Sequence, residues 1–457
     1  MKQRLQDALR GARAAYAELR LRRVWSTTVL VRGKSVEAAT ETVETGGMAR
    51  CCSAGTGWGV AGFSGDEHLD AELLRAHELS LAGASRRAVK LAPIAVRELD
   101  AADPPADDPR EVPLDQKHRR AEALAAAILG TDRRITEARL LYRDRVVETW
   151  LATSEGTWLH DLRPEVSVAA LAVAEEDGNV ERALGSLAAR GGWSACDPST
   201  MIGEVAARAI ERLHATPVRP GRYTVVLDPG AAGALVHRAV AHLARPALPG
   251  ADPHSVPVGT RVGPECLTVA DDPSAEGLPA SAPCDDEGTV ARRAVIVQNG
   301  VVTGHLHSRE TAGAAGQEPT GHARSGSLRG APYPRASNSY LAQGEGSLED
   351  LLRDIPLGIY VAGLLGCEVE AGQGDRVSLR PGMAWMIRQG QLAEPVKGAQ
   401  IDAGLLALLG RVDAVAGDFA WDSHGGHCRD GSAGVVAVTT GAPHVRLVDL
   451  AVAEGVT

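Results

Sequence analysis

Apolar and polar positions follow two different periodicities in the first half of the chain, one typical of helices and one typical of strands. Apolar side chains recur every three or four positions in three segments, which predicts amphipathic helices at 3–20, 66–81 and 115–129. Alternating or glycine-rich runs predict strands at 24–31, 35–45 and 57–65, the first two joined as a hairpin by Arg-Gly-Lys. Short strands follow from 134 to 173. Helix, hairpin, helix and meander in this order indicate an α+β fold rather than alternating βαβ units.

The second half is dominated by strand patterns. A helix and a Pro/Gly cluster at 217–221 separate it from the first half. We therefore expect two domains: an N-terminal helix and antiparallel-sheet domain at 1–200, and a C-terminal, mostly β domain at 218–457. Asn299-Gly300 joins two alternating runs and is a preferred sequence for a type I′ hairpin turn. Residues 312–338 are rich in Gly, Pro and Ser, and such a long irregular segment is more often a functional loop than packing.

Composition narrows the class of protein. A hydrophobic fraction of 44% and a charged fraction of 23% are typical of a globular chain. Aromatic residues make up 3% and the net charge is −10, so neither a base-stacking platform nor a phosphate-neutralising surface is expected. The chain has no apolar window long enough for a membrane span and no signal-peptide pattern. Seven irregularly spaced cysteines argue against a disulfide framework. We expect a cytoplasmic protein with reduced thiols and with no nucleic-acid or membrane partner.

The segment TVVLDPGAAGALVHRAVAHLARP, at 224–246, holds the first candidate chemistry. A buried strand leads into a helix that Asp228 can cap and Pro229 can begin. His237 and His242 lie five positions apart on this helix. In a regular α-helix these positions are about 140° apart around the axis, whereas a π-type bulge would bring them nearly into line. From the spacing alone, the two histidines fit either a partly exposed polar face or a ligand pair.

A glycine-rich segment near the C-terminus, SHGGHCRDG, contains a second group of candidate metal-binding residues. It contains His424, His427 and Cys428. One thiolate and two imidazoles suit a three-ligand zinc site with a position left open. Read alone, Cys428 also fits a free thiol on a loop.

Many motifs in collinear order resemble the TldD/PmbA family of modulators of DNA gyrase, on its TldD side. They include AAYAELRL, GWGVAGF, TSEGTW, VIVQNGVVTGHLHSRETA, PRASNSYL, GIYVAGLLGCEVEAGQGD and EPVKGAQI, and they extend over nearly the whole chain. The resemblance implies a two-domain α+β chain that assembles with itself or with a paralogous subunit. It also implies a zinc peptidase acting on extended or unfolded peptides, including leader peptides of modified peptide products.

The same resemblance implies a set of zinc ligands. The family motif is His-Glu-x-x-x-His on a helix plus a C-terminal Cys, and it matches His237, His242 and Cys428. The chain departs from the motif at Arg238, which stands where the family has the Glu that accepts a proton from water. A guanidinium is always charged and cannot act as a base at neutral pH. The residues on both sides of the motif differ as well.

Three hypotheses follow from this departure. In the first, the metal is retained and another group acts as the base. The nearby candidates are Asp252, His254, Glu265, Asp271 and Asp272. In the second, the chain is a catalytically impaired partner in a heterodimer and shapes the substrate cavity without hydrolysing. In the third, the fold serves a specialised biosynthetic pathway, and the substrate supplies the missing proton transfer or the reaction is not hydrolysis. Retention of all three ligands favours a metallopeptidase-type hydrolase.

Two further groups of residues are candidates for substrate binding or for a structural role. The resemblance places the irregular segment beside the substrate tunnel, so we expect substrate contacts from His322, Arg324, Arg335 and Asn338. The acidic run 285–287 fits a solvated turn, or a structural or substrate-lining role.

Overall fold

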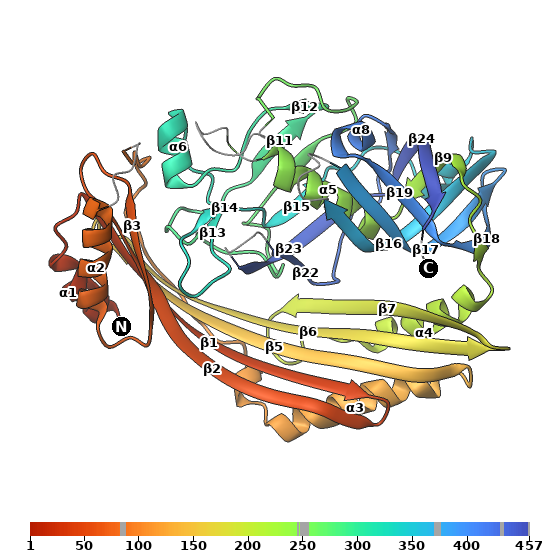
Figure 1. The fold of residues 1–457 in the computed structure, drawn as a ribbon, viewed down its shortest axis with the longest axis horizontal. Helices are drawn as coiled ribbons and strands as arrows, with labels where there is room; N and C mark the ends of the chain where they lie inside the picture. The colour runs from red at the N-terminus through yellow and green to blue at the C-terminus, as the bar shows by residue number, and fades with distance from the viewer. Residues whose placement is uncertain (83–87, 245, 247–255, 370–375, 430–433, 456–457) are drawn as a thin grey trace.

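A long curved sheet from the first half of the chain holds the β-rich second half against its concave side (Figure 1). The computed structural model describes residues 1–457 except 83–87, 245, 247–255, 370–375, 430–433 and 456–457. Among the helices in these residues, none has the length and apolar character needed to cross a membrane. Helices alternate with groups of mainly antiparallel strands, which confirms the predicted α+β class.

Seven strands form the curved sheet in the order β3-β2-β1-β5-β6-β4, and β7 also pairs with β6. Their bounds are β1 (Tyr16–Arg32), β2 (Ser35–Cys52), β3 (Trp58–Ser64), β4 (Glu98–Ala101), β5 (Ile135–Thr153), β6 (Trp158–Glu176) and β7 (Asn179–Arg190). The associated helices are α1 (Lys2–Arg10), α2 (Leu69–Ala82), the 3₁₀ turn η1 (Pro109–Glu111), α3 (Leu114–Gly130) and α4 (Ser199–Leu213). Helices α3 and α4 pack against the convex face (Figure 1). The predicted domain limits, 1–200 and 218–457, stay a prediction.

Strict alternation decides which side chains each face of this sheet carries. On β5, Ala138, Leu140 and Tyr142 are buried in the core beneath α3 and α4. Successive side chains of a strand point to opposite faces, so Arg143 and Arg145 lie on the concave side. The concave face therefore carries the charged positions of the long strands, and the second half of the chain covers part of it.

The N-terminal helix is shorter than its apolar pattern predicts. The prediction of a helix over 3–20 is wrong beyond Arg10, because β1 begins at Tyr16. From Tyr16 onward the pattern has period two: Leu19 and Leu21 are fully buried under α1 and α2, and Arg20 between them faces the opposite way.

Two sheets and a short hairpin make up the second half. One sheet follows the order β12-β11-β10-β15-β23-β21, with β22 paired to β23; the other follows β16-β9-β24-β19-β17-β18-β8, with β20 paired to β24. Because β16 also pairs with β17, the second sheet closes on itself. The strands are β8 (Thr216–Pro217), β9 (Gly221–Leu227), β10 (Val269–Asp271), β11 (Ala294–Gln298), β12 (Val301–Val302), β13 (Ala323–Arg324), β14 (Tyr333–Pro334), β15 (Asn338–Leu341), β16 (Leu357–Val369), β17 (Arg376–Arg388), β18 (Gln391–Lys397), β19 (Ala399–Gly404), β20 (Val412–Val415), β21 (Ala420–Trp421), β22 (Gly426–Arg429), β23 (Val435–Ala442) and β24 (Val445–Glu454). The helices are α5 (Pro229–Leu243), α6 (Arg309–Ala315), α7 (Leu348–Leu352) and α8 (Leu405–Leu409).

Buried ion pairs join the two halves. The acidic run 285–287 is buried, so the hypothesis of a solvated turn is wrong. Asp286 pairs with Arg22 of β1 at 2.6 Å between Oδ1 and Nη2, and Arg20 lies 3.5 Å away. Glu287 pairs with Arg50 of β2 at 2.8 Å. The run thus anchors the second half of the chain to the charged concave face of the first sheet.

Candidate active site

The helix that carries the histidine pair begins where its sequence predicts. The Asp228 side chain caps α5 by accepting a hydrogen bond from the Ala231 backbone N–H at 2.7 Å, and Pro229 is the first helical residue. Asp228 also accepts from the Gly363 N–H at 3.0 Å, which ties the start of α5 to β16. Helix α5 then packs against β23 and β15, so its inward face lies in the largest hydrophobic core.

His237 is buried on this helix in a state suited to ligation. Its side chain is 7% exposed, and its Nδ1 has no hydrogen-bond partner among the described residues. Burial, together with the charge of Arg238, lowers the pKa of His237 to about 4. The imidazole is therefore neutral at pH 7, which is the form that binds a metal.

The second histidine is placed only by its backbone. Helix α5 is a regular α-helix throughout, so the π-type bulge considered from the sequence is not formed. His242 lies on its last turn, and the His242 side chain is outside the described residues. Positions 237 and 242 are about 140° apart around a regular helix. Their convergence on one ion therefore stays a prediction.

Arg238 occupies the position next to His237 without a fixed role. Its side chain is half-buried and makes no hydrogen bond or ion pair with any described residue. A charged group in this state is free to reorient toward an anionic ligand. It cannot accept a proton at neutral pH.

Cys428 lies on a hairpin that packs beside α5. It is on β22, opposite Val436 of β23, and β23 contacts α5. The thiol is partly exposed, and Arg335 fixes the backbone here by donating to the Cys428 carbonyl at 2.7 Å. Among the described side chains, no group of three or more His, Cys, Asp and Glu is close enough to hold a metal. A neutral imidazole and a thiol are donor types that suit zinc, and the assembly of His237 and Cys428 into one site stays a prediction.

The two neighbouring histidines are less suited to ligation. The hydrogen bond to Asp422 raises the pKa of His424, which favours the protonated ring. His427 is exposed, and its Nε2 lies 3.7 Å from Glu165 on β6. Both side chains are exposed, unlike the buried imidazole of His237.

The candidate bases near the helix have varied surroundings. Asp271 is fully buried and accepts from Ser337 N–H at 2.9 Å and from His322 Nε2 at 3.1 Å. Burial alone would raise its pKa, but the hydrogen bonds and charge of His322 hold the pKa of Asp271 below its usual range. A carboxylate so fully engaged suits a structural acceptor better than a base. Glu265 is exposed and Asp272 is half-buried. Asp252 and His254 lie outside the described residues.

The expected substrate contacts are mostly engaged with the protein itself. His322 and Asn338 are fully buried, and Asn338 donates to the Asp272 carbonyl at 2.7 Å. Arg324 donates to the Ala437 carbonyl at 2.8 Å and Arg335 to the Cys428 carbonyl, so both hold the β22–β23 hairpin. The role of all four residues as substrate contacts stays a prediction, and Arg324 and Arg335 position this hairpin.

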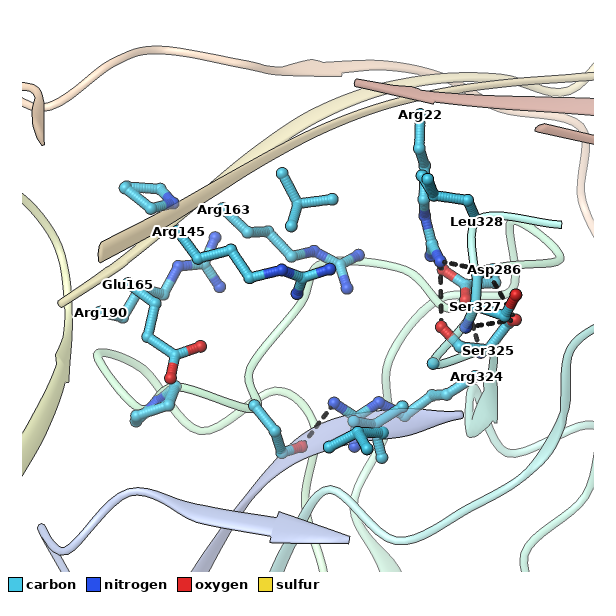
Figure 2. Close-up of a pocket in the computed structure, with 17 residues that line it drawn as sticks. Arg22, Arg145, Arg163, Glu165, Arg190, Asp286, Arg324, Ser325, Ser327 and Leu328 are labelled. Carbon is cyan, nitrogen blue, oxygen red and sulfur yellow. Dashed lines mark hydrogen bonds and ion pairs between the residues drawn. The ribbon is translucent and has the colours of Figure 1, made fainter. Parts of the chain in front are cut away.

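A pocket beside the hairpin contains residues that the sequence did not single out. It lies between the concave face of β5, β6 and β7, the segment 324–328 and the start of β23 (Figure 2). Five arginines and two carboxylates line it: Arg22, Arg145, Arg163, Arg190, Arg324, Glu165 and Asp286. The period-two alternation of charged and apolar residues on β5 and β6 is the signal that could have placed three of them on one face.

Comparison with known proteins agrees with this architecture. Residues 107–215 and 220–454 match the central and C-terminal domain models of the PmbA/TldA metallopeptidases. The chain is 33% identical over 447 residues to a protein of Synechocystis sp. named a metalloprotease, covering 96% of this chain and 95% of that protein. It is 26% identical over 257 residues to a zinc metalloprotease TldD homolog of Saccharolobus solfataricus, covering 56% of this chain and 57% of that protein.

A solved structure shares the fold. TldE from Thermococcus kodakarensis superposes with a TM-score of 0.79 at 16% identity, covering 99% of each chain. The sequence relatives and the matched domain models together identify the chain as a member of the PmbA/TldD family of metallopeptidases.

Proposed function

We propose that this chain is a TldD-type zinc metallopeptidase subunit that acts on peptide or amide bonds in extended peptides. The observation that carries the proposal is the state of His237: a buried, neutral imidazole whose Nδ1 has no partner among the described residues. The retained ligand types and the names of its relatives support the same conclusion.

His237, His242 and Cys428 would hold the metal in this proposal. When bound, zinc supplies Lewis-acid polarisation of a peptide carbonyl. His237 contributes a donor that needs no deprotonation at pH 7, and Arg335 keeps the Cys428 backbone in place. The main chain of an extended peptide would bind through hydrogen bonds to a strand edge.

Metal analysis tests the ligand set directly. Protein purified without an affinity tag should contain about one zinc per chain. Cys428→Ala should lose most of this zinc. Cys266→Ala is the control, because it removes an exposed cysteine that is not one of the proposed ligands, and it should keep the zinc. Equal zinc content in both variants, or a metal-free wild type, contradicts the proposal.

Arg238 supports a second candidate function. A guanidinium at the position of the family base favours a partner subunit that shapes the substrate cavity without hydrolysing. Arg238→Glu and Arg238→Gln separate the alternatives, because only the first supplies a proton acceptor. If Arg238 merely disables the site, Arg238→Glu should raise zinc-dependent peptide cleavage by roughly 10²–10⁴-fold and Arg238→Gln should not. If Arg238 holds an acidic substrate group, both variants should lose the native activity.

The assembly is part of the proposal. We expect a dimer with itself or with a paralogous subunit, enclosing the substrate cavity. Light scattering measures the oligomeric state of the chain alone and of the chain mixed with any paralogue encoded nearby. A monomer in both samples contradicts the expected dimer.

A further inference from the structure

The arginine-lined pocket has an unbalanced charge. Its empty volume is about 710 Å³, part of which is open to solvent. Asp286 already pairs with Arg22, and Asp161 pairs with Arg163. Arg145 makes no hydrogen bond or ion pair within the described part of the chain, and Arg190 donates only to the Ser281 carbonyl there. Arg145 and Arg190 therefore face the pocket without a carboxylate partner.

The surroundings of these two groups favour an anion. The register places Glu165 opposite Arg145 on one side and Arg190 on the other, yet Glu165 forms an ion pair with neither. Solvent reaches the Arg145 side chain, but the surrounding protein and the charge of Arg22 still lower its pKa. Burial and the charge of Arg163 lower the pKa of Arg190. An incoming carboxylate would relieve this repulsion through charge-assisted hydrogen bonds.

The pocket also adjoins the hairpin that carries Cys428. Val436 and Ala437 form part of its wall, and they pair across the hairpin with Cys428 and His427. Neighbouring strands lie about 4.8 Å apart, so a ligand in the pocket would lie one strand away from Cys428. Figure 2 shows Arg145 and Arg163 extending from the long strands into the space above β23.

We propose that this pocket is a subsite for a carboxylate of the peptide substrate, bound by Arg145 with help from Arg163 and Arg190. The inference rests on the proposed function, since it names the chemistry that the substrate must offer. The carboxylate comes either from an acidic side chain or from the C-terminus of the peptide, and both sources offer the same group to the arginines.

Binding measured by fluorescence anisotropy tests this proposal. The probes are four labelled versions of one extended peptide, with Glu or Gln at a central position and with a free or amidated C-terminus. Peptides that carry the recognised carboxylate should bind at least about tenfold more tightly. A difference that follows Glu against Gln identifies a side chain as the source, and one that follows amidation identifies the C-terminus.

Variants assign the effect to the pocket. Arg145→Gln should abolish the preference, and Arg145→Glu should favour the uncharged peptide. Arg143→Gln is the matched control, because Arg143 is exposed on the same face of β5 but outside the pocket lining. It should leave the preference intact.

The outcomes separate this subsite from the proposed function. Equal binding of all four peptides, or a preference that persists in both Arg145 variants, overturns the subsite and leaves the proposed function standing. Carboxylate-dependent binding without cleavage supports the subsite and contradicts hydrolysis. Binding of none of the peptides overturns both.

Discussion

Removing the charge of Asp286 should destabilise the protein more than any exposed ion pair can. Asp286→Asn keeps the size of the side chain but leaves the buried guanidinium groups of Arg20 and Arg22 facing a neutral amide. These arginines are 0% and 7% exposed. Breaking a buried pair by neutralising one partner costs about 3–5 kcal/mol. Both arginines also donate to backbone carbonyls, at Gly330 and Ser325, which would remain. We therefore expect about 3 kcal/mol, at the lower end of that range.

Urea unfolding followed by tryptophan fluorescence measures the loss. Glu204→Gln is the control, because Glu204 pairs with Arg208 at 3.1 Å on the exposed face of α4. Such helical surface pairs contribute about 0.5 kcal/mol or less. If Asp286→Asn lowers the free energy of unfolding by no more than the control does, the cluster does not hold the two halves together and our reasoning is refuted.

Three further outcomes are expected. Asp228→Ala removes the cap of α5 and the bond to Gly363, and should lower the free energy of unfolding by about 1–2 kcal/mol in urea titrations; no change would show that the cap is dispensable. Gly300→Ala should reduce the yield of folded protein, because φ is +75° and the new Cβ would meet the Gly263 carbonyl at 2.1 Å; a normal yield and thermal midpoint would contradict this. The charges of Arg22 and Arg20 outweigh burial and hold the pKa of Asp286 well below its usual range. Its stabilisation is therefore present above about pH 4 and lost as the pH falls, so the difference between wild type and Asp286→Asn should shrink below that pH, and a difference independent of pH would contradict it.

Local signals in the sequence were sufficient for several elements of the fold. The cap and proline at the start of α5 and the Asn299-Gly300 turn between β11 and β12 depend only on neighbouring residues, and both form as predicted. The start of β1 was missed because Tyr16 and Leu19 also fit a helical stripe. Only the pairing of β1 with β2 and β5 decides in favour of a strand there.

The candidate site depends more strongly on long-range contacts. The sequence could single out His237 and Cys428, but not the burial that keeps the imidazole neutral. It could not single out Arg145 either, since an arginine on an alternating strand is ordinary until another part of the chain covers that face. No local sequence pattern predicts that the run 285–287 is buried, because its partners on β1 and β2 are more than 200 positions away in the sequence.

The position of β9 has a consequence for how the protein is made. Val225 of β9 pairs with Ile359 of β16 on one side and with Leu447 of β24 on the other. The first sheet has its partners within its own half of the chain and could form early in synthesis. The strand that leads into the histidine helix, by contrast, has an open edge until β24 has left the ribosome. An unpaired edge of this kind is a site for aggregation. A message truncated shortly before residue 445 should therefore yield a chain with a folded first half and a second half that must be degraded or held by chaperones.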